Sequence, residues 1–335
     1  MVIRKWTFTE VESVLEERYG LVGMRISIPA LPPPRDDRLA ECGRWDVQAA
    51  DGGPVFHLVQ YDVSSVDAVK QVWHMAAYLR VLPMVYSVTA LPDCDGALVA
   101  LGRDGMPCVL FEAPQGCIVE DTVFATAGVI LAKVHRALAA YPKPARREMA
   151  WQEATAAEVI AAHERAATPT PPPSPQLQEL LRTLSWWIEA GLSSLRDGLT
   201  ALLEPGQEQA LHGAFLPTRL YWGVTLSGLG PPDPCTGLPL WELARLAFPP
   251  QNLIGNPGWL RQGTGLLTAY QRTHPAGLSP AALASTLRLT ALDLLCRPLP
   301  PDPRAWVQRH KALCTLLSAL PTTEVSLRAA LTCLS

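Results

Sequence analysis

Residues 211–230 read LHGAFLPTRLYWGVTLSGLG, and this stretch decides how the rest of the chain is interpreted. His212 and Gly213 open a short apolar loop, Pro217 lies within it, and an alternating, strand-like run follows. Acidic side chains are missing, since no carboxylate lies between residues 214 and 232. The stretch therefore predicts a loop and a hairpin that offer no carboxylate for proton transfer or metal binding.

The composition predicts a chain that is packed rather than disordered. Of its 335 residues, 48% are hydrophobic and 18% are charged, and this length suits one large or two medium domains. The net charge of −3 gives no general attraction to nucleic acid or to an anionic membrane, so we expect neither as a partner. Residues 1–12 carry charges where a signal peptide needs an apolar core, and no apolar run approaches the roughly 18 residues of a spanning helix. We expect a cytoplasmic protein.

Cysteine and proline patterns indicate how the chain is cross-linked and divided. The eight cysteines contain no Cys-x-x-Cys pair, which argues against a zinc site and against a disulfide framework. We therefore expect free thiols and no metal ligands. Residues 168–175 are rich in proline and predict a stiff surface linker, with a polyproline II ligand for a partner as the alternative.

The first third of the chain predicts a small sheet with two helices. Thr9 and Glu12 form a candidate capping box for a helix that ends at Gly20. Two alternating runs flank the turn at residues 51–53, a strong hairpin signal, and a helix follows over residues 65–82. Further strand-like runs, which complete five strands, lie at residues 84–91, 97–101 and 108–111.

The remainder of the chain predicts mainly helices. Apolar residues recur at helical spacing over residues 121–142 and over residues 176–203. Residues 239–247 and three later segments continue this pattern toward the C-terminus. We therefore expect a sheet-forming first part and a helical second part.

Three motifs carry a resemblance to a known family: LAKVHRAL at residues 131–138, HGAFLP at residues 212–217 and LPLWELARL at residues 238–246. In these motifs and their spacing the chain resembles the aminoglycoside phosphotransferase, homoserine kinase and choline kinase family. The resemblance implies an α+β, two-lobed protein-kinase-like fold. It places a small antiparallel β-sheet N-lobe at residues 1–112 and a larger, mainly helical C-lobe at residues 113–335.

The resemblance also shows where catalytic groups are expected, and the chain departs from the family at each of these places. The catalytic loop of such kinases carries an Asp that receives the substrate proton and, about five residues later, an Asn for Mg²⁺, while a second metal-binding Asp follows on the next hairpin. Those places hold Ala214, Arg219 and Gly228. By contrast Glu242 retains an acid that in relatives supports the catalytic loop. The chain is therefore identified as a degenerate member with no catalytic residues.

The phosphate-binding groups depart in the same way. The family's phosphate-binding Lys falls at Val59, or at Gln60 if the register shifts by one, and its glutamate partner has no equivalent in the following helix beyond Asp67. Where a glycine-rich loop would cradle phosphates, Pro32 to Pro34 remove amide donors. ATP binding is therefore doubtful, and we expect no bound cofactor.

Four residues are candidates for ligand binding in the former cleft. VLFEAPQG at residues 109–116 resembles the hinge whose backbone binds adenine in active relatives, so Phe111 and Ala113 could bind an adenine-sized ligand; an ordinary linker is the alternative. Arg219 could bind an anion, with a solvent-facing or ion-paired arginine as the alternative. His212 completes the set, although its counterpart in relatives is usually structural.

Three functions are consistent with this sequence. The first is a pseudokinase that acts by binding a protein partner or a small ligand. The second is an active small-molecule phosphotransferase that uses displaced carboxylates such as Asp36, Glu112 or Asp233. The third is a metabolite sensor in which the former substrate cleft holds a small molecule without transforming it.

Overall fold

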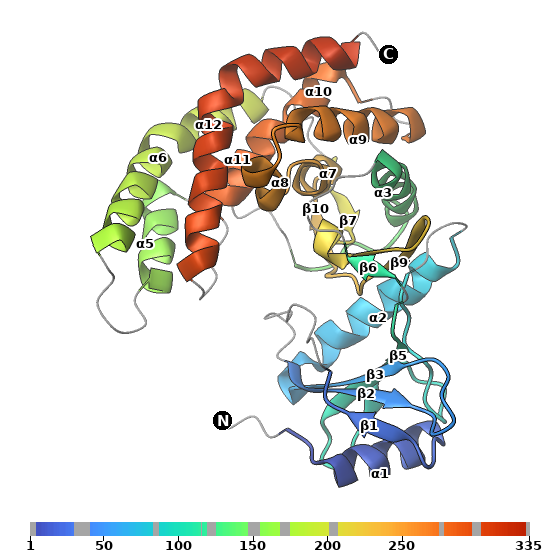
Figure 1. Cartoon of the computed structure of the whole chain (residues 1–335). Coiled ribbons are helices and arrows are strands. Elements are labelled where there is room, and N and C mark those ends of the chain that lie inside the picture. The colour runs from blue at the N-terminus through green and yellow to red at the C-terminus, as the bar shows by residue number, and fades with distance from the viewer. Residues whose placement is uncertain are drawn as a thin grey trace. The chain divides into compact units, whose positions relative to one another are not determined.

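The structure is a computed structural model that describes residues 5–29, 41–82, 87–114, 116–118, 125–146, 155–167, 175–200, 207–274, 278–296 and 303–332. The chain forms two units, one of Met1–Cys117 with Arg219–Pro234, and one of Ile118–Thr218 with Cys235–Ser335 (Figure 1). The predicted lobes at residues 1–112 and 113–335 stay a prediction. Residues 168–174 of the predicted linker lie outside the described residues.

The first unit is built on an antiparallel sheet, as the hairpin pattern predicts. Its strands, in spatial order, are β1 (Arg25–Ser27), β2 (Glu41–Gln48), β3 (Phe56–Tyr61), β5 (Pro107–Glu112) and β4 (Ala100–Leu101). Of the predicted strand at residues 84–91, the described part makes only isolated bridges, from Ser87 to Leu229 and from Ala90 to Phe111. The hairpin strands β8 (Leu220–Trp222) and β9 (Leu226–Leu229) belong to this unit as well.

Each face of the five-stranded sheet buries an apolar cluster against a helix. On one face Leu58 and Trp45 pack with Val11 and Leu15 of α1 (Phe8–Tyr19). On the other face a second cluster packs against α2 (Val66–Arg80). Because side chains alternate along a strand, consecutive residues of β3 enter different clusters.

Helix α1 begins earlier than the sequence pattern predicts. The capping box uses Thr7 and Glu10, not Thr9 and Glu12: the Glu10 carboxylate accepts the Thr7 N–H at 2.8 Å, and Thr7 Oγ1 accepts the Glu10 N–H at 3.4 Å. The pattern Thr-x-x-Glu occurs in both registers. Trp6, just before the observed cap, and Val11, the fourth residue of the helix, are buried in one cluster, and this hydrophobic staple favours the register observed. Gly20 ends the helix in the left-handed conformation, as predicted.

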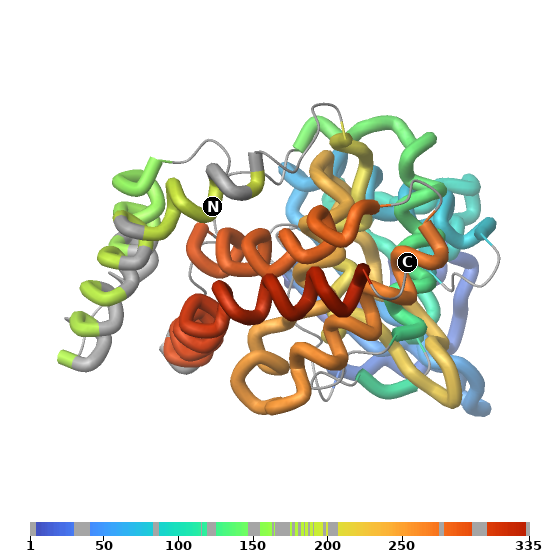
Figure 2. The backbone as a smooth tube through the Cα atoms, turned by 90° about the horizontal axis from the view of Figure 1, so that it is seen from above, coloured from blue at the N-terminus to red at the C-terminus, as the bar shows by residue number. Residues whose placement is uncertain are grey.

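The second unit is mainly helical. Its helices are α3 (Ala125–Leu138), α5 (Ala156–Ala167), α6 (Pro175–Thr200), α7 (Pro239–Ala247), α8 (Pro250–Gly255), α9 (Trp259–Thr273), α10 (Pro280–Ala284), α11 (Thr286–Cys296) and α12 (Pro303–Thr332). Two short strands, β7 (Gln209–Leu211) and β10 (Cys235–Gly237), pair antiparallel within it. Helices α5 and α6 lie side by side in both views (Figures 1 and 2). No helix in the part of the chain that the structure describes is long and apolar enough to span a membrane.

Candidate functional site

The loop that follows β7 carries the motif His212-Gly213-Ala214-Phe215. Gly213 has φ = 74°, a left-handed conformation that glycine adopts without a steric penalty. His212, Ala214 and Phe215 are buried, and the His212 ring meets the Phe215 ring edge-on at 5.6 Å between centroids. The loop is therefore a packed part of the second unit, and Ala214, where the resemblance predicts a catalytic Asp, is only 6% exposed.

Helix α7 holds this loop through a buried carboxylate. Glu242 is 1% exposed and accepts hydrogen bonds from the Phe215 N–H at 3.3 Å and from His135 Nε2 at 3.0 Å. Nδ1 of His135 lies 2.8 Å from the Tyr270 hydroxyl. His135 donates from Nε2 to Glu242, and its Nδ1 shares a second hydrogen bond with the Tyr270 hydroxyl.

The surroundings of Glu242 keep it ionised. Burial alone would raise its pKa, but the hydrogen bond from His135 and the electrostatic attraction of His135, His212 and Arg245 hold the pKa below its ordinary value. The pKa of Tyr270 is raised by burial and by the nearby Glu242 charge, so its hydroxyl stays protonated and can donate. The predicted structural role of Glu242 in supporting the loop therefore matches its contacts.

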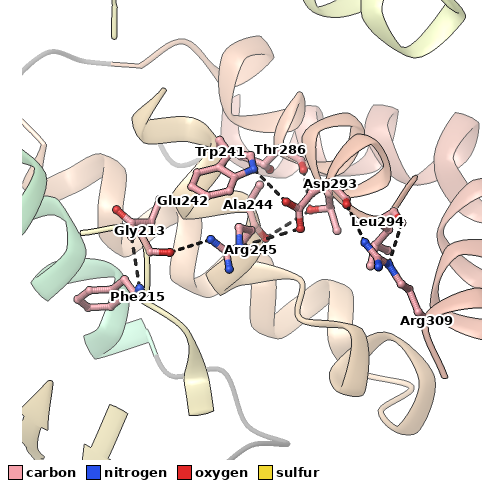
Figure 3. Close-up of polar contacts among 11 residues, drawn as sticks. Gly213, Phe215, Trp241, Glu242, Ala244, Arg245, Thr286, Asp293, Leu294 and Arg309 are labelled. Atoms are coloured by element: carbon pink, nitrogen blue, oxygen red, sulfur yellow. Dashed lines mark hydrogen bonds and ion pairs between the residues drawn. The ribbon is translucent and has the colours of Figure 1, made fainter. Parts of the chain in front are cut away.

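Arg245, one turn further along α7, fixes the loop from a second direction (Figure 3). Its Nη1 donates to the Gly213 carbonyl at 2.9 Å, and its guanidinium lies 4.5 Å from the centre of the Trp241 ring. Trp241 Nε1 in turn donates to Asp293 Oδ1 at 3.1 Å, which ties α7 to α11. Arg309 of α12 donates to the Asp293 carbonyl.

Sequence reasoning missed Arg245, Tyr270 and Asp293. A signal for Arg245 exists in its place three residues after Glu242, on the same face of a helix whose other residues are apolar. Tyr270 and Asp293 lie in later helices without a local motif, so only the tertiary structure brings them to the loop.

In the first unit, the position at which the resemblance predicts a phosphate-binding Lys is apolar. Val59 is fully buried in the cluster that β3 and β5 form with Val69, Val72 and Trp73 of α2. Gln60 points to the other face, where its Oε1 accepts the N–H of Trp6 at 3.1 Å. Asp67, the acid nearest the place of the family's glutamate, is exposed in the first turn of α2.

The hairpin position at which the resemblance predicts a metal-binding Asp holds a buried glycine with close neighbours. Gly228 on β9 is buried, and a Cβ added to it would lie 3.3 Å from Pro114 Cβ and 3.6 Å from Tyr221 Cβ. At the base of the hairpin, the Gly230 N–H donates to the Arg219 carbonyl at 2.8 Å. A Cβ at position 228 would therefore require Pro114 to shift by a few tenths of an ångström, whereas its contact with Tyr221 would be an ordinary one.

The four predicted ligand-binding residues fall in different units. Phe111, Ala113 and Arg219 belong to the first unit and His212 to the second. Phe111 is 3% exposed, with its ring 4.9 Å from that of Trp73. The Ala113 N–H already donates to the Val55 carbonyl at 2.8 Å.

Arg219 is half-buried at the base of the hairpin. Burial raises the pKa of the neighbouring Tyr221, and the positive charges of Arg219 and Arg44 oppose that rise. Arg44 is itself paired with Glu41 at 2.7 Å. Ligand binding by Phe111, Ala113, His212 and Arg219 stays a prediction.

Sequence comparison leaves the chain without a match, whereas structural comparison finds many. No protein-family model matches it, and a search of curated proteins finds no similar sequence. Among solved structures it is similar to a microcompartment-associated aminopropanol kinase, with a TM-score of 0.62, 15% identity, and 96% of this chain and 98% of that chain covered. The chain has the fold of aminoglycoside phosphotransferases and related kinases.

Two further similar structures support this fold. The spectinomycin phosphotransferase APH(9)-Ia has a TM-score of 0.60 at 8% identity, covering 96% of this chain and 98% of its own. An aminoglycoside phosphotransferase from Alicyclobacillus acidocaldarius has a TM-score of 0.57 at 12% identity, covering 91% of this chain and 98% of its own. The predicted α+β, kinase-like fold, with an antiparallel sheet in one unit and mainly helices in the other, is confirmed.

Proposed function

We propose that this protein has a phosphotransferase fold without phosphotransferase activity, and that it acts by binding a protein partner or a small ligand. The observation that carries the proposal is the replacement of charged groups at the family's catalytic places. Val59, Ala214 and Gly228 stand there, whereas the Glu242 support of the loop is present.

Physical chemistry makes these replacements costly for phosphoryl transfer. The reaction depends on positioning and on neutralising phosphate charge, and Mg²⁺ and a Lys supply much of that neutralisation. Mg²⁺ requires oxygen ligands, and the hairpin strands β8 and β9 contain no carboxylate. The Lys place is filled by Val59 inside an apolar cluster, which a charged side chain could enter only at a high desolvation cost.

The test is a calorimetric titration of the purified protein with ATP, once with Mg²⁺ and once with a chelator. No binding in either condition, or binding without metal, supports the proposal, and the latter would indicate a nucleotide sensor. Binding that requires Mg²⁺ would instead favour an active enzyme with displaced carboxylates. Of those candidates, Glu112 is exposed on β5, and Asp36 lies outside the described residues.

A turnover assay completes the test. Phosphate transfer from ATP would be measured with spectinomycin and aminopropanol as acceptors, because two of the structurally similar enzymes are named for these compounds. Turnover above the background without protein would end the proposal. The cytoplasmic location and the exclusion of nucleic acid and membrane as partners stay predictions from composition.

A further inference from the structure

A groove on the second unit is lined by α9, by the C-terminal part of α12 and by Ala125 at the start of α3. Helices α9 and α12 are in contact. Its volume is about 700 Å³, and its wall is mostly apolar. The lining residues of α9 recur three or four positions apart, from Arg261 through Gly265 and Ala269 to Arg272, so they follow one face of the helix. The opposite wall includes Leu327 and Ala330 of α12.

The floor of this groove is formed by small residues and presents an effectively apolar surface. Two threonines of α9 line it, but their hydroxyls are occupied within the helix: Thr264 Oγ1 donates to the Leu260 carbonyl and Thr268 Oγ1 to the Thr264 carbonyl, each at 2.8 Å. Such threonines present mainly their methyl groups outward. Small residues along one helix face allow another helix to approach closely.

Packing within the chain does not require a glycine at position 265. A Cβ added at Gly265 would meet no atom within 4 Å, and the residue is exposed in the middle of α9. Two residues earlier the situation is the reverse, since a Cβ at Gly263 would lie 2.2 Å from Phe248 Cε1. Glycine inside a helix lowers stability relative to alanine. Internal packing explains Gly263 but not Gly265.

The rim of the groove is positively charged. Arg261 and Arg272 both line it and are both exposed, and 11 residues of helix place them about 16 Å apart along the axis. Among the described residues that line the groove there is no carboxylate, and the sequence of α9 contains none. The charge pattern therefore suits an acidic partner.

We propose that this groove binds an amphipathic helix of a partner protein. The small apolar face of that helix would lie over Gly265 and Ala269. Its acidic residues, about three helical turns apart, would pair with Arg261 and Arg272. This inference rests on the proposed partner-binding function and names the kind of partner.

The test uses a displayed library of amphipathic helices of about 15 residues, selected on the full chain. Enriched peptides would be synthesised and titrated by fluorescence anisotropy. The Gly265→Trp variant fills the groove, and Gly255→Trp is its matched control, because a Cβ at Gly255 of α8 also meets open space and Gly255 does not line the groove. A double variant, Arg261→Glu with Arg272→Glu, reverses the rim charge.

We expect enriched peptides to carry acidic residues about 11 positions apart and to lose about tenfold in affinity for Gly265→Trp but not for Gly255→Trp. The charge-reversed variant should prefer the same peptides with lysine in place of the acids. The inference is wrong if no peptide is enriched, if enriched peptides show no acidic bias, or if they bind Gly265→Trp as tightly as the unaltered chain. Those results would not bear on the turnover assay, so failure here is distinguishable from failure of the proposed function.

Discussion

Helix α7 and strand β3 both bury a side chain at a place where the resemblance to kinases predicts a charge, and they do so in opposite ways. On α7 the Glu242 carboxylate is kept, with His135 and the Phe215 N–H as partners. On β3 the place of the Lys holds Val59, packed among apolar residues of α2. A buried charge is tolerated only with a complete set of partners. The α7 site keeps the charge together with its partners, and the β3 site has an apolar side chain instead. The comparison separates the groups that support the loop from the groups that would transfer phosphate.

The largest effect is expected from Glu242→Ala, which removes the partner of two buried donors. The Phe215 N–H and His135 Nε2 would be left without their acceptor in the core, which should lower the free energy of unfolding by about 3 to 5 kcal/mol. Denaturant unfolding followed by circular dichroism would measure the loss. A loss below about 1 kcal/mol would show that the buried carboxylate does not hold the loop.

The conservative variant Glu242→Gln tests the charge of this side chain through the pH dependence of stability. The folded chain lowers the pKa of Glu242, so the charge contributes stability above the unfolded value of about 4.3 and loses that contribution as the pH falls through the folded pKa. The stability advantage of the unaltered chain over Glu242→Gln should therefore be full near neutral pH and shrink in acid. A constant advantage down to acid unfolding would contradict the assignment.

Val59→Lys tests whether the apolar cluster around β3 tolerates a charge. The ammonium would enter an apolar cluster in which the described part of α2 offers only Asp67, exposed at its start, so we expect a loss of about 3 kcal/mol at neutral pH. The loss should become smaller as the pH approaches about 10, because a neutral lysine is buried more easily. Val59→Met, whose side chain is close to lysine in volume, is the control; it should cost about 1 to 3 kcal/mol, and this cost should not change with pH.

Ala214→Asp asks whether one restored carboxylate brings back chemistry. The new side chain would be buried close in sequence to Phe215, whose N–H binds the Glu242 carboxylate, so we expect a loss of about 2 kcal/mol. Phosphate transfer from ATP should stay at background, because Val59, Arg219 and Gly228 still lack the remaining groups. Measurable turnover by this single variant would show that the other parts of the site are functionally present.

Periodicity and motifs predicted much of this molecule, and their limits have a physical cause. Alternation along β3 and the turn at residues 51–53 predicted the hairpin, because strand pairing and tight turns are read from local sequence. The support of the loop by Glu242 followed from a motif. The contacts of Tyr270 with His135 and of Asp293 with Trp241 could not be predicted, since the partners are 135 and 52 residues apart along the chain.

The predicted start of α1 was wrong for a different reason, because two overlapping Thr-x-x-Glu patterns are equally good capping boxes in the local sequence. Local sequence therefore identified the elements and one end of the buried network. Tertiary packing determines which cap begins α1 and brings Tyr270 and Asp293 to their partners.

The smallest expected effect has the opposite sign and concerns α9. Gly265→Ala should raise the free energy of unfolding by about 0.5 to 1 kcal/mol, because its Cβ meets open space and alanine favours the helix. Gly263→Ala, in the same helix, should lower it, since its Cβ would clash with Phe248. Thermal unfolding of both variants measures the contrast, and a shift in the same direction would contradict it. If the Gly265→Ala variant is more stable but binds acidic helical peptides less tightly, the glycine serves the groove and not the fold.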